Sequence, residues 1–386
     1  MAVSAVMFGI VALMLASGFI EWIYYDLRES TIHSRLGHLQ VVRPGYHRAG
    51  QSDPFAYLLP AGSAELDAIR RMPHVRSVAP RLHFSGLASH GDTTISFVGD
   101  AVDPALESDS SRSLVIEKGS ALAPGDANGV LFGAGLANNL GVGIGDRVVL
   151  LVNTASGGVN AVELTVRGLF SSVTKAYDDS ALRLPIATAR SLLRVQGAHA
   201  WVVLLDDTRA TDEIASALRS RLPAAQFEVT PWYELADFYR KTVALFSKQV
   251  DIVRIIIGAI IVLSISNTLT MVVLERTGEI GTSMALGVPR ARILGQFIAE
   301  GASLGVVGGI AGVVIGTLLA WLISGIGIPM PPPPGMAHGY IGQIRITPAL
   351  TASAFALAAI TATVASLYPA WRASRLVIVD ALRRNR

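Results

Sequence analysis

Long apolar runs alternate along this chain with a polar stretch of ordinary composition. Residues 1–20, 255–274 and 346–371 carry no charged side chain. A further apolar run, residues 293–328, holds Glu300 as its single charged residue. Each run is long enough to span a bilayer, because about 20 residues of α-helix cross about 30 Å of hydrocarbon. The predicted transmembrane helices are residues 1–25 and about 252–274, 293–328 and 348–371.

The first run could instead be a cleaved signal peptide. Residues 1–20 lack a basic n-region and are longer than a typical apolar h-region. We therefore expect a retained membrane anchor.

Residues 26–245 mix short strand patterns with short helix patterns, which predicts an α+β domain. The predicted fold class is a membrane protein with four transmembrane α-helices and a large α+β extracytoplasmic domain inserted between the first and second helices. Residues 246–386 form the remaining domain, with the other three spans. The predicted strands are residues 37–42, 75–90, 94–98, 147–152, 161–170, 201–205 and 227–230, and the predicted helices are residues 64–72, 134–140, 186–195 and 211–222.

One continuous helix is predicted from Trp232 into the second span, because no helix breaker interrupts this stretch. Residues 21–36 are also free of Gly and Pro, which predicts a matching extension of the first span. These extensions are either stiff stalks that carry movement into the inserted domain or helix ends packed on it. Trp201, Trp232 and Tyr233 are likewise open between an exposed contact surface and the domain core.

Arginines near the ends of the spans predict the orientation in the membrane. The loop between the second and third spans carries Arg276, Arg290 and Arg292, whereas the next loop carries Arg345 alone. The C-terminal tail carries Arg372, Arg375, Arg383, Arg384 and Arg386. Because basic residues stay on the cytosolic side, we expect this loop and both termini in the cytosol and the inserted domain outside.

Composition excludes several classes of function. Charged residues make up 16% of the chain, against about 25% in soluble domains. A net charge of +3 is too small to indicate a nucleic-acid partner. The chain has no cysteine, which excludes disulfides, thiolate metal sites and cysteine nucleophiles.

The lysines also argue against catalysis by this chain. Lys118, Lys175, Lys241 and Lys248 do not follow a glycine, so the Walker A motif of P-loop ATPases is absent. Ser172 to Lys175 spells S-x-x-K, but the companion motifs of penicillin-recognising enzymes are missing. We expect a non-enzyme that binds no cofactor and no metal itself.

Two further groups resemble sites without completing one. His33, His38 and His47 lie close in sequence without metal-ligand spacing, so scattered surface histidines are expected. Asp178 and Asp179 are adjacent, and neighbouring strand residues face opposite ways. A turn or surface position is expected for this pair.

Glycines recur at every fourth position in the third span. The two series are Gly301, Gly305 and Gly309, and Gly308, Gly312 and Gly316. Small residues at this spacing let another helix approach closely, although glycine is also common in membrane helices generally. Two overlapping series favour a packing face, within the chain or across a dimer.

The residues 329–335 that follow (PMPPPPG) predict a stiff external polyproline turn.

A short charged segment joins the second and third spans. Residues 275–287 read ERTGEIGTSMALG, and Ile280, Met284 and Val288 fall on one side at helical spacing. Gly287 suits the position after a helix end, and Pro289 suits the first turn of the next helix. A docking helix and an inert amphipathic loop are the two interpretations.

The sequence of this segment resembles the signature of FtsX-like ABC permeases, the superfamily that includes the MacB and LolC/LolE proteins. Residues 275–281 (ERTGEIG), followed by 285–287 (ALG), carry the resemblance. The tail motif PAWRASR at 369–375 is similar to the end of the same domain. Residues 37–41 (GHLQV) resemble LolC/LolE-like members, and residues 133–146 resemble the MacB-type periplasmic core.

The resemblance implies a mechanotransmitting (type VII) transporter of the bacterial inner membrane. Two permease chains, identical or paralogous, would be served by two separate ABC ATPase subunits that bind ATP and Mg. Membrane lipid and a periplasmic lipoprotein or adaptor would be further partners. The segment between the second and third spans is the coupling element of the family. The residues that take this role here by resemblance are Glu275, Arg276, Glu279, Ile280, Met284, Leu286 and Gly287.

One departure concerns the start of the chain. Family members begin with a basic cytosolic helix before the first span, and this sequence begins at the span itself. Either the start lies further upstream, or ATPase docking relies on residues 275–287 and the tail.

Three functions are compatible with these expectations. The first is release of a lipoprotein or other hydrophobic cargo from the outer leaflet, supported by residues 37–41. The second is MacB-like tripartite export of drugs or peptides, which would require an adaptor. The third is a relay that activates a cell-wall hydrolase, for which the inserted domain is large.

Overall fold

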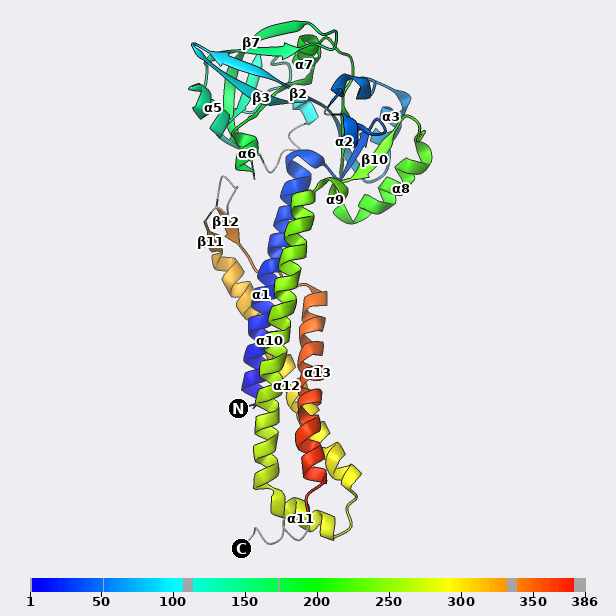
Figure 1. The fold of residues 1–386 in the computed structure, drawn as a ribbon, viewed down its shortest axis with the longest axis vertical. Coiled ribbons are helices and arrows are strands. Elements are labelled where there is room, and N and C mark those ends of the chain that lie inside the picture. Colours follow the sequence, from blue (N-terminus) through cyan, green and yellow to red (C-terminus); the bar gives the residue numbers. More distant parts are fainter. Residues whose placement is uncertain (1, 51, 107–113, 173, 332–338, 378–386) are drawn as a thin grey trace. The chain divides into compact units, whose positions relative to one another are not determined.

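Four long helices dominate the first of two compact units. The computed structural model describes residues 2–50, 52–106, 114–172, 174–331 and 339–377. The first unit, here the membrane unit, comprises Met1–Tyr25, Lys241–Met330 and Ile341–Arg386; the second, the soluble unit, comprises Asp26–Arg240 and Pro331–Tyr340. The long helices are α1 (Ala2–Thr31), α10 (Asp237–Glu275), α12 (Arg290–Ile326) and α13 (Pro348–Ser374) (Figure 1). All four are long and apolar enough to cross a membrane, which confirms the predicted number of spans in the described residues.

Glycines on α12 let two neighbouring helices approach closely in the membrane unit. A Cβ atom at Gly309 would lie 3.1 Å from that of Ala358 on α13, and Gly301 and Gly305 face the same helix. A Cβ atom at Gly312 would lie 2.8 Å from that of Ile10 on α1. Gly308 and Gly316 also face α1, opposite Val6 and Met14 respectively. One glycine series therefore packs on α13 and the other on α1, both within this chain.

Small residues on the neighbouring helices complete this packing. Ala354, Ala358 and Ala362 recur every fourth residue on α13 and are fully buried. The hydroxyl of Ser266 on α10 donates a hydrogen bond to the carbonyl of Ala365 at 2.7 Å. Helices of a membrane bundle gain stability from close van der Waals contact and interhelical hydrogen bonds, and both are present here.

A closed barrel forms one half of the soluble unit. Its ring of pairings runs β2–β3–β8–β5–β7–β6 and returns to β2. Inward-facing side chains such as Phe132, Leu150 and Leu164 are buried in its core. The strands are β2 (Val75–His90), β3 (Thr93–Val102), β5 (Gly129–Gly133), β6 (Arg147–Asn153), β7 (Val159–Ser171) and β8 (Ala181–Pro185), with β4 (Val115–Gly119) added at β7.

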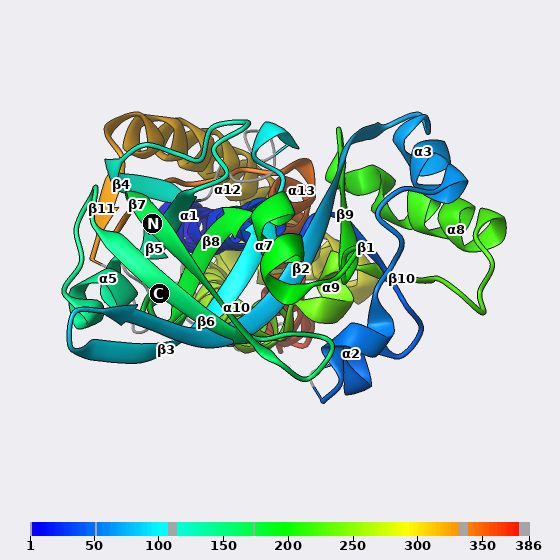
Figure 2. The same ribbon diagram turned by 90° about the horizontal axis from the view of Figure 1, so that it is seen from above.

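An open sheet forms the other half, and β2 belongs to both. Residues 75–81 of β2 pair with β9, whereas residues 82–90 pair with β3 (Figure 2). The open sheet has the order β10–β1–β9–β2 and carries α3 and α8, whose apolar faces join the same core. The bounds are β1 (Leu39–Val42), β9 (Ala200–Leu205), β10 (Glu228–Pro231), α3 (Ala64–Arg70) and α8 (Thr211–Arg221).

Short elements complete both units. They are η1 (Ile32–Leu36), α2 (Tyr46–Ala49), η2 (Pro54–Tyr57), α5 (Ala134–Leu140), α6 (Lys175–Asp178), α7 (Ile186–Leu193), η3 (Thr208–Ala210), α9 (Trp232–Leu235), β11 (Ile328–Met330) and β12 (Tyr340–Gly342).

A charged cluster is buried where the open sheet meets the barrel. Nη1 of Arg81 lies 3.0 Å from Oδ2 of Asp100, and Nη2 of Arg183 lies 3.5 Å from the same oxygen. Burial alone would raise the pKa of Asp100, but Arg81, His83 and Arg183 outweigh it and hold that pKa well below its usual range. Arg183 also donates a hydrogen bond to the carbonyl of Ser34 at 2.9 Å. The cluster therefore ties three strands to the residues that follow α1.

The helix predicted from Trp232 into the second span is interrupted. Helix α9 ends at Leu235, Ala236 adopts φ −88° and ψ 65°, and α10 starts at Asp237. Trp232 and Ala236 are both buried in one apolar cluster. Burying both side chains fixes the chain in a break that the residue types did not indicate. The extension of the first span is confirmed, since helical structure continues to Leu36.

Candidate functional site

The segment between the second and third spans folds as a short helix, α11 (Thr277–Ala285). Ile280 and Met284 on this helix are buried against Val273 of α10, Phe297 of α12 and Ala370 of α13. One apolar cluster therefore joins α11 to the ends of three spanning helices. The amphipathic helix expected from residue spacing is confirmed, although it is shorter than residues 275–287.

Both ends of α11 are held by defined backbone interactions. Arg276 breaks the helical path at its start, and the hydroxyl of Thr277 donates to the carbonyl of Val273 at 2.8 Å. At the other end, the amide of Val288 donates to Ser283 and the amide of Gly287 donates to Met284, both at 3.1 Å. This pattern is a Schellman motif, which needs a left-handed residue after the helix.

Gly287 supplies that conformation at φ +91°. Pro289 is the N-cap of α12 rather than a residue of its first turn. The turn predicted between the two helices is therefore present, and it fixes the direction in which α12 leaves α11.

The outer side of α11 is exposed and charged. Glu275 is the last residue of α10, and Arg276 and Glu279 follow on the exposed side. None of these three forms an ion pair with a residue in the described ranges. Leu286 is 82% exposed, although it is a large apolar side chain. Of the residues assigned to coupling, Ile280 and Met284 hold the helix in place, and Glu275, Arg276, Glu279 and Leu286 face outward.

The S-x-x-K residues do not form a nucleophile and base pair. The hydroxyl of Ser172 donates to the carbonyl of Thr174 at 3.3 Å. Nζ of Lys175 lies 3.0 Å from Oδ1 of Asp179. Each group therefore has another partner, and Val173 lies outside the described residues.

Asp178 is buried, so of the two expected positions, a turn or the surface, the surface is wrong for this residue. Its carboxylate is 2% exposed and accepts hydrogen bonds from the amide of Ser172 and the hydroxyl of Ser171. It lies in the short helix α6 and caps the loop before it, whereas Asp179 pairs with Lys175. The two carboxylates thus have separate structural roles.

His38 corrects the prediction of scattered surface histidines. It is 2% exposed, and burial lowers its pKa to about 4. Its Nδ1 accepts a hydrogen bond from the amide of Leu205 at 3.0 Å, so its Nε2 carries the proton shared with Thr208. No group of three histidine or acidic residues suited to a metal is found in the part of the chain that the structure describes.

Of the aromatic residues left open by the sequence, Trp201 and Trp232 belong to the domain core, whereas Tyr233 is partly buried and packs against it. Trp201 is completely buried and Trp232 is 5% exposed. The hydroxyl of Tyr233 donates to Asp212 at 2.6 Å, and this hydrogen bond raises the pKa of Tyr233 to about 12.

Residues 332–335 of the proline run and 381–386 of the tail lie outside the described residues.

The chain has four apolar helices, an α+β domain inserted between the first and the second, and a short charged helix, α11, between the second and the third. This combination defines a polytopic membrane protein of the permease class. The family model for the MacB-like periplasmic core domain matches residues 1–221. The family model for the FtsX-like permease C-terminal domain matches residues 252–378. The chain belongs to the FtsX-like permeases with a MacB-like periplasmic core domain, a family of non-catalytic transporter subunits.

Three curated proteins illustrate what the chain is similar to. An uncharacterized ABC transporter permease of Methanocaldococcus jannaschii is 28% identical over 219 residues, which cover 55% of this chain and 53% of that protein. The lipoprotein-releasing system transmembrane protein LolC of Xylella fastidiosa is 27% identical over 282 residues, covering 68% of this chain and 66% of LolC. The macrolide export ATP-binding/permease protein MacB of Nitrobacter winogradskyi is 28% identical over 350 residues, covering 88% of this chain and 51% of MacB. The chain thus spans about half to two thirds of the length of these relatives.

Proposed function

We propose that this protein is the permease subunit of an ABC transporter and that α11 receives motion from a separate ATPase. The observation that carries the proposal is the division of α11 into two sides. Its inner side is packed on α10, α12 and α13 through Ile280 and Met284. Its outer side presents Glu279 and Leu286 without partners in the described residues. Force applied to the outer side would therefore reach three spanning helices at once.

The orientation and assembly follow from the same proposal. Residues 275–287 and both termini lie in the cytosol, where an ATPase supplies ATP binding and hydrolysis, and the soluble unit lies in the periplasm. Two ATPase subunits serve two permease chains, identical or paralogous. Lysine and arginine near the ends of the spans support this orientation.

The proposed cargo is a lipoprotein or another lipid-like molecule released from the outer leaflet of the inner membrane. The similarity to a lipoprotein-releasing LolC protein over 68% of this chain supports that cargo. Export of drugs or peptides is the second candidate, because similarity to a macrolide-exporting MacB protein extends over 88% of the chain. An adaptor that co-purifies with the chain would favour the second candidate.

The test is purification of the tagged full chain from membranes together with an ATPase assay. We expect a P-loop ATPase to co-purify, and we expect Glu279→Lys to abolish transport while membrane insertion is retained. Glu279→Gly, which weakens the helix, should have the same effect.

Glu213→Lys is the matched control, since Glu213 is also exposed and lies in the first turn of its helix, α8. Full transport by a correctly inserted Glu279→Lys protein would remove the coupling assignment. Purification without any ATPase would remove the transporter proposal itself.

A further inference from the structure

Helix α10 carries a second apolar face, which is exposed in the part of the chain that the structure describes. Its first face, which includes Gly258, Ile261 and Ile265, is buried against α1 and α13. On the opposite side, exposed large residues recur along the helix. At 3.6 residues per turn they lie within about 60° of one another around the helix axis. This free face consists of Leu245, Ile252, Ile256, Leu263, Asn267 and Leu274.

Asn267 places an amide on the free face within the hydrocarbon layer, about 10 Å inside one end of the uncharged run 255–274. Its side chain is exposed and has no hydrogen-bond partner among the described residues. Neighbouring polar groups are satisfied: the hydroxyl of Ser266 donates to the carbonyl of Ala365, and that of Thr268 donates to a carbonyl of its own helix. An amide in contact with lipid is unfavourable, because lipid offers it neither donor nor acceptor.

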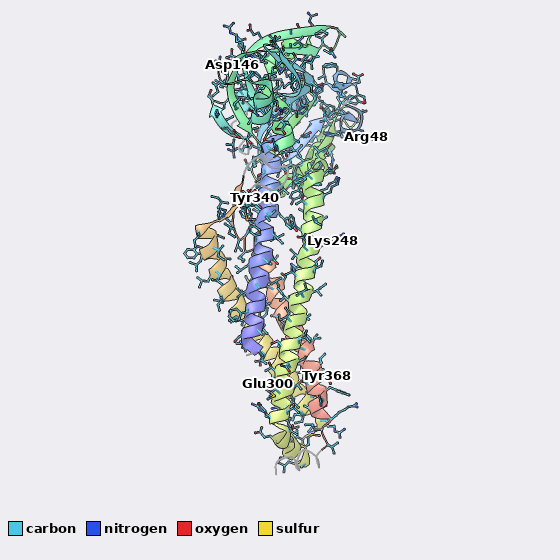
Figure 3. The ribbon with its side chains drawn as sticks, turned by 60° about the vertical axis from the view of Figure 1, so that its left-hand side comes forward. Arg48, Asp146, Lys248, Glu300, Tyr340 and Tyr368 are labelled. Atoms are coloured by element: carbon cyan, nitrogen blue, oxygen red, sulfur yellow. The ribbon has the colours of Figure 1, made fainter. Side chains whose placement is uncertain are left out.

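The same face carries an apolar side chain outside the hydrocarbon. Leu245 is 58% exposed and lies about 15 Å before the uncharged run begins. This part of α10 carries Lys241, Lys248, Asp251 and Arg254, which places it in water. Lys248 projects from α10 away from α1, so this side of the helix is not covered by α1 (Figure 3). A single covering helix would remove the leucine from water and the amide from lipid together.

A second copy of this chain fits the free face by its chemistry and geometry. Both glycine series on α12 pack within the chain, so a contact between chains needs another surface. An asparagine amide has donors and an acceptor, so two Asn267 side chains can hydrogen-bond to each other across a two-fold axis. Two copies inserted in the same way hold their α10 helices parallel, with equal residues at equal depth. One asparagine in the seam of parallel helices fixes their register.

We propose that α10 forms the contact between two copies of this chain. Asn267 of one copy hydrogen-bonds to Asn267 of the other, and Leu245, Ile256 and Leu263 pack along the same seam. The two permease chains are therefore identical, since the pairing joins like residues. This inference refines the two-chain assembly of the proposed function and needs no ATPase. Recovery of an ATPase and contact between permease chains are separate measurements, so either can fail alone.

Disulfide crosslinking tests the contact, because the full chain has no cysteine of its own. Ile256→Cys places a thiol on the free face, and Ile255→Cys places one about 100° away around the same helix. Both isoleucines are exposed, at 53% and 71% respectively. Two differently tagged forms of each variant are co-expressed, and the membranes are oxidised with copper phenanthroline. We expect a dimer that carries both tags, about fivefold more abundant for Ile256→Cys, because a disulfide needs Cα atoms within about 7 Å.

Variants of Asn267 in the Ile256→Cys chain test the hydrogen bond itself. Asn267→Leu should reduce the crosslinked dimer about fivefold, as loss of interhelical hydrogen bonds implies. Asn267→Gln keeps the amide and should retain most of the dimer. Thr268→Val is the matched control, because the hydroxyl of Thr268 is satisfied within its own helix. Unchanged crosslinking in the Asn267→Leu chain overturns the amide pairing.

The remaining outcomes identify what else covers the free face. Equal crosslinking of the Ile255→Cys and Ile256→Cys chains overturns the assigned face. Oxidised Ile256→Cys protein that stays monomeric overturns the contact between copies. In that case, recovery of a second polypeptide in equal amount identifies a paralogous partner, and recovery of the chain alone identifies lipid as the covering.

Discussion

Arg81 and Asp100 form an almost completely buried ion pair, 3.0 Å between Nη1 and Oδ2, at the point where β2 passes from the open sheet to the barrel. Arg183 reaches the same carboxylate from β8 and the carbonyl of Ser34 in η1. A single carboxylate thus balances two guanidinium groups that arrive from different strands. Its removal would leave both cations buried in the domain.

We therefore predict that Asp100→Asn lowers the free energy of unfolding of the soluble unit by about 3–5 kcal/mol, the usual effect of leaving a buried charge without its partner. Thermal unfolding of the full chain in detergent measures this change. Asp126→Asn is the control, because the pair between Asp126 and Arg167 is partly exposed at 2.8 Å. The control should change stability by less than about 1 kcal/mol, and equal effects of the two variants would contradict the prediction.

Stability should also fall with moderate acidification, because of two buried histidines. Burial lowers the pKa of His38 and that of His199 to about 4. In each, Nδ1 accepts a backbone amide hydrogen bond at 3.0 Å, which protonation would break. The unfolded chain binds protons below about pH 6.5, whereas the folded chain does not until about pH 4, so the free energy of unfolding decreases between these values. The expected loss is about 3 kcal/mol for each histidine over the whole window.

The melting temperature at pH 7.5 and pH 5 tests this dependence. His38→Gln should show a smaller difference between the two pH values than the unaltered protein. His74→Asn, at an exposed position with φ +65°, should keep the full difference. Asp100 does not contribute in this window, because its lowered pKa keeps the carboxylate charged. A pH-independent melting temperature would refute the assignment.

Glycines of α12 offer a test of packing in the membrane unit. Gly312→Val should destabilise the bundle by about 1–3 kcal/mol, since added atoms would overlap Ile10. Gly295→Val changes the same residue type in the same helix, but no atom lies within 4 Å of a Cβ placed there. Thermal aggregation in detergent should therefore occur at a lower temperature for Gly312→Val alone. Similar curves for both variants would show that close packing at Gly312 is unimportant.

The exposed Leu286 should matter for partner binding and not for folding. If α11 docks on an ATPase, Leu286→Ser should reduce co-purification of that subunit by about tenfold, as truncation of a central apolar contact often does. Ile326→Ser is the control, since Ile326 is 87% exposed at the other end of α12. Quantitative immunoblots of the purified complex measure the ratio. Equal recovery of the ATPase with both variants would exclude Leu286 from the interface.

The membrane unit was largely predictable, because length, apolarity and spacing decide the structure of a spanning helix. The two glycine series on α12 predicted a packing face, but their partners could not be assigned. Which of Ala358 on α13 or Ile10 on α1 faces a given glycine depends on how the helices are arranged in three dimensions. A cavity of about 300 Å³ between α1, α10 and α13 was missed for the same reason: its lining residues come from three helices distant in sequence.

The soluble unit was predictable in part. Strand β2 was predicted with its observed bounds, whereas β4, β5 and β8 were missed. Strand β8 contains the fully buried Arg183, and β3 contains the buried Asp100. A charged residue reads as a surface position in a sequence pattern, and only its ion pair across strands makes burial possible. Closure of the barrel therefore could not be inferred from the alternation of apolar and polar residues along the strands alone.

The position of β1 in the open sheet has a consequence for biosynthesis. Residues 39–42 leave the ribosome soon after the first span, yet their two neighbours, β9 and β10, are among the last parts of the soluble unit to be made. Until those strands emerge, both edges of β1 lack backbone partners and can pair wrongly. Because such distant pairings are slow to form, we expect closure around β1 to be the late, rate-limiting event in maturation of this permease.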